Sequence, residues 1–435
     1  MKKVFSNRNF SLIFFGNFVS SIGSSVYNFG IGWYILRGLG LEDNKAIHFA
    51  LYMATGAVIQ LLLAPFGGVI ADRLDKVKIV YITDFIRGIV IAVAGVLFFT
   101  DLTLTTTFIL LYTCTIVLAV NGALFGPAIS SLQTEVVDEE DLLTAQATMS
   151  MINSFRGIIG VFLGGAFMAI LGIKWIFIIN AVSFIFSGFS EMFIKHKFDK
   201  EFDDKLSLSS GLKELKEGIK YLRSIRGLVP LMICALFLNF AFTPMFTNGF
   251  PYLFEDILKT SPLHLSLVEV GISIGSLIGA IVIGNFSRRI NTKKAVYNGL
   301  TYMVGLFIIV TGLIYFVIEG QISYYVFFFT LIGMMFIEGI VNMYVNVPLQ
   351  TSFVKKISPD YRGRAFAVIS TLSMAAIPLA IVIGGIIIEY AGIVVLGLYS
   401  VVIVLIILFA VLTNRSIKDY LESCKTESKE ATVDL

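Results

Sequence analysis

The sequence predicts an all-α polytopic membrane protein with twelve transmembrane helices, arranged as two six-helix pseudo-repeats. Hydrophobic residues make up 57% of the 435 residues and charged residues only 14%, with a mean hydropathy of +0.86. A soluble protein of this length could not cover so much apolar surface. Twelve apolar runs are each long enough for the hydrocarbon core, which takes about 20 residues. Two pairs of short motifs also recur at similar offsets along the chain.

The first span follows a basic segment and lacks a small-residue cleavage site, so we expect it to be retained rather than removed as part of a signal peptide. Each later run is separated from the next by a short polar or charged segment. The twelve predicted spans are about 10–36, 46–71, 79–99, 104–127, 144–170, 173–194, 227–251, 265–287, 295–318, 322–347, 364–388 and 393–413.

The orientation follows from the Lys and Arg residues. With both termini in the cytoplasm, the inner segments carry 27 of them and the outer loops carry 4. Positive residues stay on the cytoplasmic side, so we expect a multi-pass protein of the cell (plasma) membrane with both termini cytoplasmic. The inner loop 128–143 holds five acidic residues and no basic one, but acidic residues count little in this rule.

The longest connection, 195–226, separates the two sets of six spans. Five apolar residues recur in it at helical spacing opposite basic residues, which predicts an amphipathic helix on the inner leaflet: Leu208, Leu212, Leu215, Ile219 and Leu222. We expect the polar chain end to fray. The predicted parts are an N-terminal bundle 1–194, a cytoplasmic linker 195–226, a C-terminal bundle 227–413 and a cytoplasmic tail 414–435.

Several classes of function are disfavoured by composition. The net charge is only +3, which argues against nucleic acid as a partner. The three cysteines (Cys114, Cys234 and Cys424) and the three histidines are scattered, so neither a disulfide framework, a metal site nor a cofactor is expected. We expect a monomer whose partners are the lipid bilayer and a small-molecule substrate.

The segment Gly67–Lys78, GGVIADRLDKVK, joins the second and third spans. It resembles the signature loop of the major facilitator superfamily, Gly-x-x-x-Asp-Arg-x-Gly-Arg-Lys. Asp75 stands where the family usually has Gly, a variant that resembles the macrolide-efflux-type branch of the drug exporters. The matching residues are Gly68, Asp72, Arg73, Lys76 and Lys78.

Two internal repeats agree with that resemblance. Gly68–Arg73 recurs in degenerate form 216 residues later as Gly284–Arg289, and Gly164-Gly165 recurs 220 residues later as Gly384-Gly385. The family's fold implies two halves that rock around a substrate site near the membrane midplane. It also implies a cytoplasmic latch formed by residues of the inner loops; the alternatives are an ordinary solvated loop and glycines that only allow close packing. The latch candidates are Gly68, Asp72, Arg73, Lys76, Asp84, Arg87, Arg288 and Arg289.

The chain departs from the family's drug antiporters in two places. They often carry an Arg four residues before a Gly in the fourth span, where this chain has Leu118 before Gly122. They also often carry Gly-Pro-x-x-Gly-Gly in the fifth span, where Gly160–Gly165 reads GVFLGG. Both departures weaken a direct transfer of proton antiport but leave the predicted fold unchanged.

Polar residues form stripes on three spans that surround the central cavity in the family's fold. Single hydroxyls and amides often join helices instead, and rings such as Phe240 often only pack, but three stripes together indicate a lined path. The stripe residues are Asn17, Ser21, Ser24 and Asn28 in the first span, Asn239, Thr243 and Thr247 in the seventh, and Glu338, Asn342 and Asn346 in the tenth.

Two charges are predicted to lie near the midplane. At the rise of a helix, Glu338 is about 15 Å and Arg156 about 18 Å from the cytoplasmic end of its span. Ionised groups at that depth are costly and usually mark a pathway. One hypothesis is that Glu338 exchanges a proton or binds a cationic substrate with Arg156 as its partner; the other is a structural ion pair between the halves.

The function expected from these observations is secondary-active export of a small amphiphilic compound or drug by alternating access, driven by the proton gradient. Uptake or facilitated transport of a small metabolite remains open, as do the substrate and the coupling ion. A membrane-embedded lipid-modifying enzyme is disfavoured, because the sequence offers no cluster of His, Cys, Ser or paired acids at one depth.

Overall fold

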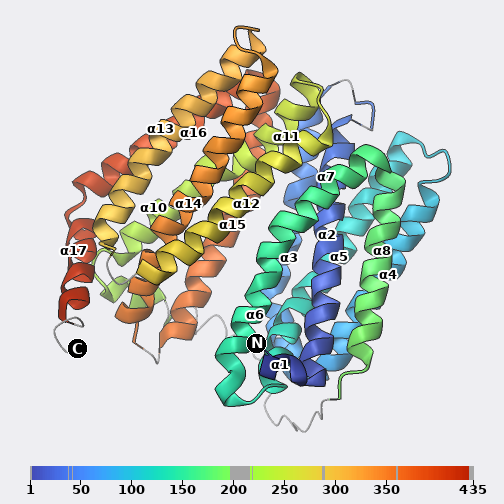
Figure 1. Cartoon of the computed structure of the whole chain (residues 1–435), viewed down its shortest axis with the longest axis horizontal. Coiled ribbons are helices and arrows are strands. Elements are labelled where there is room, and N and C mark those ends of the chain that lie inside the picture. The colour runs from blue at the N-terminus through green and yellow to red at the C-terminus, as the bar shows by residue number, and fades with distance from the viewer. Residues whose placement is uncertain are drawn as a thin grey trace. The chain divides into compact units, whose positions relative to one another are not determined.

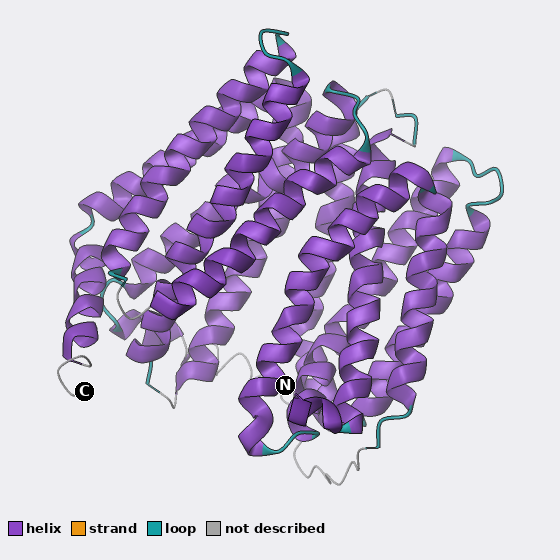
Figure 2. Cartoon of the chain, in the orientation of Figure 1, coloured by secondary structure: helices purple, strands orange, loops and turns teal. Residues whose placement is uncertain are grey.

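Helices account for nearly all of the chain in the computed structural model, which describes residues 2–37, 39–41, 43–195, 216–217, 219–286, 290–358 and 361–430 (Figures 1 and 2). Within these residues there is no strand. Twelve helices among them are long and apolar enough to cross a membrane, each overlapping one predicted span. The all-α polytopic fold is therefore confirmed.

The first half of the chain contains six spans, one of them divided by a wider π-helical turn, η2. A short 3-10 turn, η1, precedes the divided span. The elements are α1 (Lys2–Ser6), α2 (Arg8–Arg37), α3 (Lys45–Arg73), α4 (Lys76–Leu97), α5 (Leu104–Glu135), η1 (Glu139–Asp141), α6 (Leu142–Phe155), η2 (Arg156–Gly160), α7 (Val161–Ile170) and α8 (Ile173–Met192).

The second half repeats this order and adds a helix at the chain end. Its first span is divided by two π-helical turns, η3 and η4. The elements are α10 (Leu228–Thr243), η3 (Pro244–Gly249), α11 (Phe250–Tyr252), η4 (Leu253–Ile257), α12 (Pro262–Phe286), α13 (Thr292–Ile318), α14 (Tyr324–Lys356), α15 (Arg362–Ala391), α16 (Ile393–Thr413) and α17 (Arg415–Glu430).

The ends of corresponding helices use matching residues in the two halves. Asp75 accepts hydrogen bonds from the N–H groups of Val77 (3.1 Å) and Lys78 (3.3 Å) at the start of α4. Asn291, 216 residues later, accepts one from Lys294 at the start of α13. Such side chains satisfy helix N–H groups that have no partner within the helix. Asp75, which departs from the family's usual Gly, therefore has a local role as a helix cap.

A second set of helix boundaries recurs at an offset of 220. Thr103 and Ser323 cap the starts of α5 and α14. Gly172 and Gly392 connect the next helix pairs with φ values of 76° and 84°, a conformation that glycine adopts without strain. The pseudo-repeat in the sequence is thus also a repeat of local structure.

Close helix contacts explain both repeated glycine pairs. A Cβ atom added at Gly164 would meet Phe29 of α2, and one at Gly384 would meet Pro244 of η3, so each first glycine faces the first span of its own half. The second glycine of each pair faces the second span of the other half of the chain. A Cβ atom added at Gly165 would meet Ser266 of α12, and one added at Gly385 would meet Ala50 of α3. Small residues at these positions let the backbones approach closely.

Those contacts affect how the chain divides into compact units. The first unit comprises Met1–Lys45, Tyr52–Leu206 and Phe254–Val270, and the second comprises Ala46–Leu51, Ser207–Leu253 and Gly271–Leu435. The units therefore differ from the predicted bundles by an exchange of two short segments. Phe254–Val270 joins the first unit partly through an ion pair between Lys45 Nζ and Asp256 Oδ1 (2.6 Å).

The two segments expected outside the bundles have different outcomes. Most of the predicted linker helix lies outside the described residues; within 219–224, which are helical, Leu222 is buried and Ile219 is exposed. The expectation of a frayed chain end is wrong for Arg415–Glu430, which forms α17, whereas residues 431–435 lie outside the described residues.

The helix α17 lies against α10 and α13 (Figure 1). Ile417, Tyr420 and Leu421 are spaced so that they share one helix face, and all three are buried. The Lys293 ammonium donates to Glu422 Oε1 over 2.6 Å. The apolar face and this ion pair explain why a strongly polar segment packs on the second unit.

Candidate functional site

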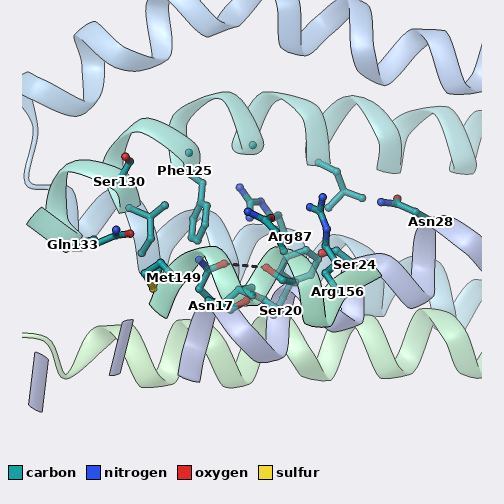
Figure 3. A pocket seen from close by; sticks show the side chains of 18 of the residues that line it. Asn17, Ser20, Ser24, Asn28, Arg87, Phe125, Ser130, Gln133, Met149 and Arg156 are labelled. Carbon is teal, nitrogen blue, oxygen red and sulfur yellow. Dashed lines mark hydrogen bonds between the residues drawn. The ribbon is translucent and has the colours of Figure 1, made fainter. Parts of the chain in front are cut away.

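A cavity of about 630 Å³ lies within the first unit. Its wall is built by α2, α3, α4, α5, α6, η2 and α8, and polar side chains outnumber the apolar ones among its lining residues (Figure 3). Its size is in the range of ligand sites for drug-sized molecules. The described lining residues are Asn17, Ser20, Ser21, Ser24, Tyr27, Asn28, Gln60, Arg87, Leu118, Gly122, Phe125, Gly126, Ile129, Ser130, Gln133, Gln146, Met149, Ser150, Ile152, Asn153, Arg156, Asn180 and Phe184.

The polar stripe predicted on the first span lies in this wall. Asn17, Ser21, Ser24 and Asn28 of α2 all line the cavity. The Ser21 hydroxyl donates to Asn17 Oδ1 over 3.0 Å, drawn as a dashed line in Figure 3. Because residues four apart share a helix face, one side of α2 supplies hydrogen-bond donors and acceptors along the length of the cavity.

Arg156 also lines the cavity, at the point where α6 passes into η2. A π-helical turn is wider than an α-helical one, which leaves backbone groups to find other partners. Here the Ser25 hydroxyl of α2 donates to the Arg156 carbonyl over 3.2 Å, and Gly160 allows α2 to approach. The Arg156 side chain is exposed and points into the cavity (Figure 3). Among the described residues, its guanidinium has no hydrogen-bond or ion-pair partner.

Arg87 is the second positive residue in the wall, and it is buried. It lies about 16 Å into α4 at 1.5 Å per residue. Its Nη1 donates to Asp84 Oδ1 over 3.0 Å, and its guanidinium lies 4.6 Å from the centre of the Phe125 ring. Neither Nε nor Nη2 of Arg87 has a hydrogen-bond partner among the described residues.

Asp84 and Glu191 stand behind Arg87, and both are fully buried. Glu191 interacts electrostatically with Asp84 and Arg87, and Ser187 donates to its Oε1 over 3.2 Å. Asp84 and Arg87 were both expected in the cytoplasmic latch. The structure instead places them inside the helix bundle, where Arg87 joins the wall of the cavity.

The wall contributed by α5 is open because it contains two glycines. A Cβ atom added at Gly122 or Gly126 would meet nothing within 4 Å. Leu118, which stands where drug antiporters of the family often have Arg, is one of the lining residues. The positive charge absent from that position is present elsewhere in the same cavity, on α4 and at η2.

The candidates of the second half lie in the second unit. Glu338 of α14 is buried, with 2% of its surface exposed, and neither carboxylate oxygen has a hydrogen-bond partner among the described residues. Asn346 donates to Asn342 Oδ1 over 2.9 Å, so these two amides bond to each other. On α10, Asn239 and Phe240 are half-buried.

The loop candidates are only partly described. Lys76 is 3% exposed, and its ammonium donates to Glu135 Oε1 at the end of α5 over 2.7 Å. A Cβ atom added at Gly68 would meet nothing within 4 Å. Arg73 ends α3, and the side chain of Asp72 lies outside the description. Arg288 and Arg289 also lie outside the described residues, so the latch stays a prediction.

Several residues of the cavity were missed from the sequence. The amides Gln60, Gln133, Gln146 and Asn180 line it, and Gln146 forms a stripe on α6 with Ser150 and Asn153 at the spacing of Asn17, Ser21 and Ser24 on α2. Arg87 was expected in the latch cluster at the cytoplasmic end of the third span, because it lies one helical turn from Asp84. Its depth within an apolar run was the signal that could have placed it in the membrane interior.

Comparisons with known proteins agree with a transporter. The model of the Major Facilitator Superfamily matches residues 13–376. The chain is 24% identical over 398 residues to macrolide efflux protein A of Streptococcus pyogenes, covering 88% of this chain and 90% of that protein. It is 22% identical over 391 residues to the multidrug efflux pump Tap of Mycolicibacterium fortuitum, covering 88% and 89%.

Among solved structures, a bacterial homologue of the iron transporter ferroportin in its inward-facing state has a similar fold. Its TM-score is 0.71 at 15% identity, and the match covers 94% of this chain and 99% of that one. Within the residues described here, no group of three or more His, Cys, Asp or Glu side chains could hold a metal ion.

The twelve helices of the described residues that are long and apolar enough to cross a membrane, together with the match to the superfamily model, indicate a multi-pass membrane transporter for a small molecule. The chain belongs to the Major Facilitator Superfamily.

Proposed function

We propose that the protein exports a small amphiphilic compound by alternating access, using the proton gradient. The observation that carries this proposal is the cavity of about 630 Å³, which combines amide, hydroxyl and arginine side chains with Leu118, Phe125 and Ile129. In such a cavity, the polar part of an amphiphilic molecule can form hydrogen bonds and its apolar part can pack against apolar side chains. The similarity to macrolide and multidrug efflux proteins supports the outward direction.

Glu338 is the proposed proton-binding group. It is buried in a membrane-spanning helix, and its carboxylate oxygens have no hydrogen-bond partner among the described residues. An ionised carboxylate without a partner is expensive in such a place. A change in access to Glu338 during the cycle would therefore change its proton occupancy, which is what coupling requires.

The topology belongs to the same proposal. The excess of Lys and Arg on one side favours cytoplasmic termini, and we propose in addition a plasma-membrane location and a monomeric state. In that orientation, Asp75, Lys76 and Glu135 lie at the cytoplasmic end of the first unit. The pair between Lys76 and Glu135 would then join the inner ends of α4 and α5, and the cap of Asp75 would stabilise the start of α4.

Substitution of a cavity glycine tests the proposal. Gly122→Leu places a side chain into open cavity space, whereas Gly312→Leu makes the same change in α13, where a Cβ atom also meets nothing within 4 Å. Both variants are to be compared with the unaltered protein at equal membrane abundance in cells exposed to a panel of toxic compounds from several drug classes.

We expect the unaltered protein and Gly312→Leu to raise the inhibitory concentration for one group of compounds, and Gly122→Leu to lose this protection. Uptake would instead make cells more sensitive, and Gly122→Leu would abolish that sensitivity. If Gly122→Leu protects cells as well as the unaltered protein does, the cavity is not on the transport path.

A further inference from the structure

The cavity of the first unit contains positive charge that no acidic residue of its described wall balances. Two of the described lining residues are arginines, and none is Asp or Glu. Arg87 is balanced from behind the wall, because Asp84 is bonded to it and Glu191 interacts with both, which leaves Arg156 as the unbalanced charge. The exposed guanidinium of Arg156 has no described partner in its own unit.

The two arginines differ in how they could serve a ligand. Arg156 is accessible from the cavity and presents its whole guanidinium fork. Arg87 uses only Nη1 to hold Asp84, which leaves the Nε–Nη2 edge without a hydrogen-bond partner. Both atoms of that edge are themselves buried, and the guanidinium lies close to the rings of Phe125 and Phe184, so Arg156 is the arginine that a ligand in the cavity can reach. Arg87, only 7% exposed, is thus a buried polar side chain with unused donors in the cavity wall.

An unbalanced cation inside a membrane protein attracts an anion, because a low-dielectric surrounding strengthens the interaction. Guanidinium groups match carboxylates and phosphates through paired N–H donors. A cationic ligand would be repelled by the same groups, and a neutral ligand would leave the charge unpaired. Amide side chains of the wall, such as Gln133 and Asn153, can donate hydrogen bonds to the rest of a polar ligand or accept them from it.

We propose that this cavity binds an organic anion whose carboxylate or other oxyanionic group bonds to the guanidinium of Arg156. The apolar body of the ligand rests against the side of the cavity that carries Leu118 and Phe125. This inference rests on the proposed function, since it names the substrate class of the same site.

Four fluorescent probes with one common body test it: dansyl-glycine (a carboxylate), N-dansyl-O-phosphoethanolamine (a phosphate), dansyl-glycinamide (neutral) and dansyl-ethylenediamine (a cation). Binding is measured by fluorescence titration of the full-length protein in lipid nanodiscs, with empty nanodiscs as the blank. The variants are Arg156→Gln, Arg156→Lys and, as a matched control, Arg226→Gln, which alters an exposed arginine of the second unit.

We expect at least one anionic probe to bind about tenfold or more tightly than the amide, since hydrogen bonds to charged groups are the strong ones. The cation should bind most weakly. Arg156→Gln should reduce binding of the anionic probe about tenfold without changing that of the amide, and Arg156→Lys should have a smaller effect because the charge remains. Arg226→Gln should leave all four affinities unchanged. The ratio of carboxylate to phosphate binding identifies the oxyanion.

Tighter binding of the amide or the cation, no saturable binding of either anion, or an anion preference that survives Arg156→Gln would each overturn the proposal. Exchange of the same probes in proteoliposomes separates it from the proposed function. If anions bind but no probe is exchanged, transport is refuted and the anion site stands. If the amide or the cation is exchanged and no anion binds, transport stands and the anion site is refuted.

Discussion

Removal of the Arg87 charge should destabilise the first unit more than removal of any single exposed charge does. Arg87→Met leaves Asp84, which is 0% exposed, without the cation that donates to it over 3.0 Å, beside the equally buried Glu191. Loss of one partner of a buried ion pair costs about 3–5 kcal/mol. Loss of the contact between the guanidinium and the Phe125 ring adds about 1–2 kcal/mol.

The partner substitution tests whether this cost comes from the unpaired carboxylate. Asp84→Asn keeps a hydrogen-bond acceptor beside Arg87, and Glu191 remains as a counterion, so we expect a loss of about 1–3 kcal/mol. The double variant Asp84→Asn/Arg87→Met removes both charges. It should be more stable than Arg87→Met alone, with a coupling of about 2–3 kcal/mol between the two sites.

The assay is unfolding of the purified protein in mixed micelles, followed by the circular dichroism of its helices. Lys78→Met is the control, because Lys78 is largely exposed and lies 3.8 Å from Asp75, and such pairs are worth about 1 kcal/mol or less. Additive losses in the double variant would refute the reasoning, since they would show that Arg87 does not stabilise the protein by neutralising Asp84.

Three further outcomes are expected. Asp75→Ala should lower stability by about 1 kcal/mol through loss of the cap on α4, and Asp75→Asn should restore most of it in the same unfolding assay. Arg223→Cys, at an exposed position, should react with an impermeant thiol reagent only in opened cells if this segment is cytoplasmic. Tyr420→Ala removes a side chain that is 2% exposed and should increase protease cleavage within α17, whereas cleavage equal to the unaltered protein would show that α17 does not depend on this contact.

The number and order of the spans could be predicted because the membrane imposes a length and a composition on each helix. The π-helical turns that interrupt some of the spans could not be predicted. The span predicted at 227–251 continues to Ile257 through two π-helical turns, the first of which begins at Pro244, a residue that lacks a backbone N–H group. The π-helical turn at Arg156–Gly160 contains no proline and depends on tertiary contacts of Ser25 in α2 with Arg156 and Gly160.

The candidate site was predictable where its residues share one helix face. The stripe of Asn17, Ser21 and Asn28 lies in the cavity wall because helical periodicity alone puts these residues together. Arg87 and Asn180 come from other helices, and only the packing of α4 and α8 brings them to the same space. The docking of α17 was missed for a similar reason: three apolar residues in a polar segment bury their side chains only when a partner surface exists.

Coupled transport by the Glu338→Gln variant tests the central claim most directly. Proteoliposomes are loaded with a compound that the protein exchanges, and its accumulation under an imposed pH gradient is compared with exchange at equal pH. Glutamine resembles the protonated acid but cannot release a proton. We predict that Glu338→Gln loses accumulation and keeps a substantial part of exchange. If the variant still concentrates the compound at the rate of the unaltered protein, Glu338 does not couple transport to protons.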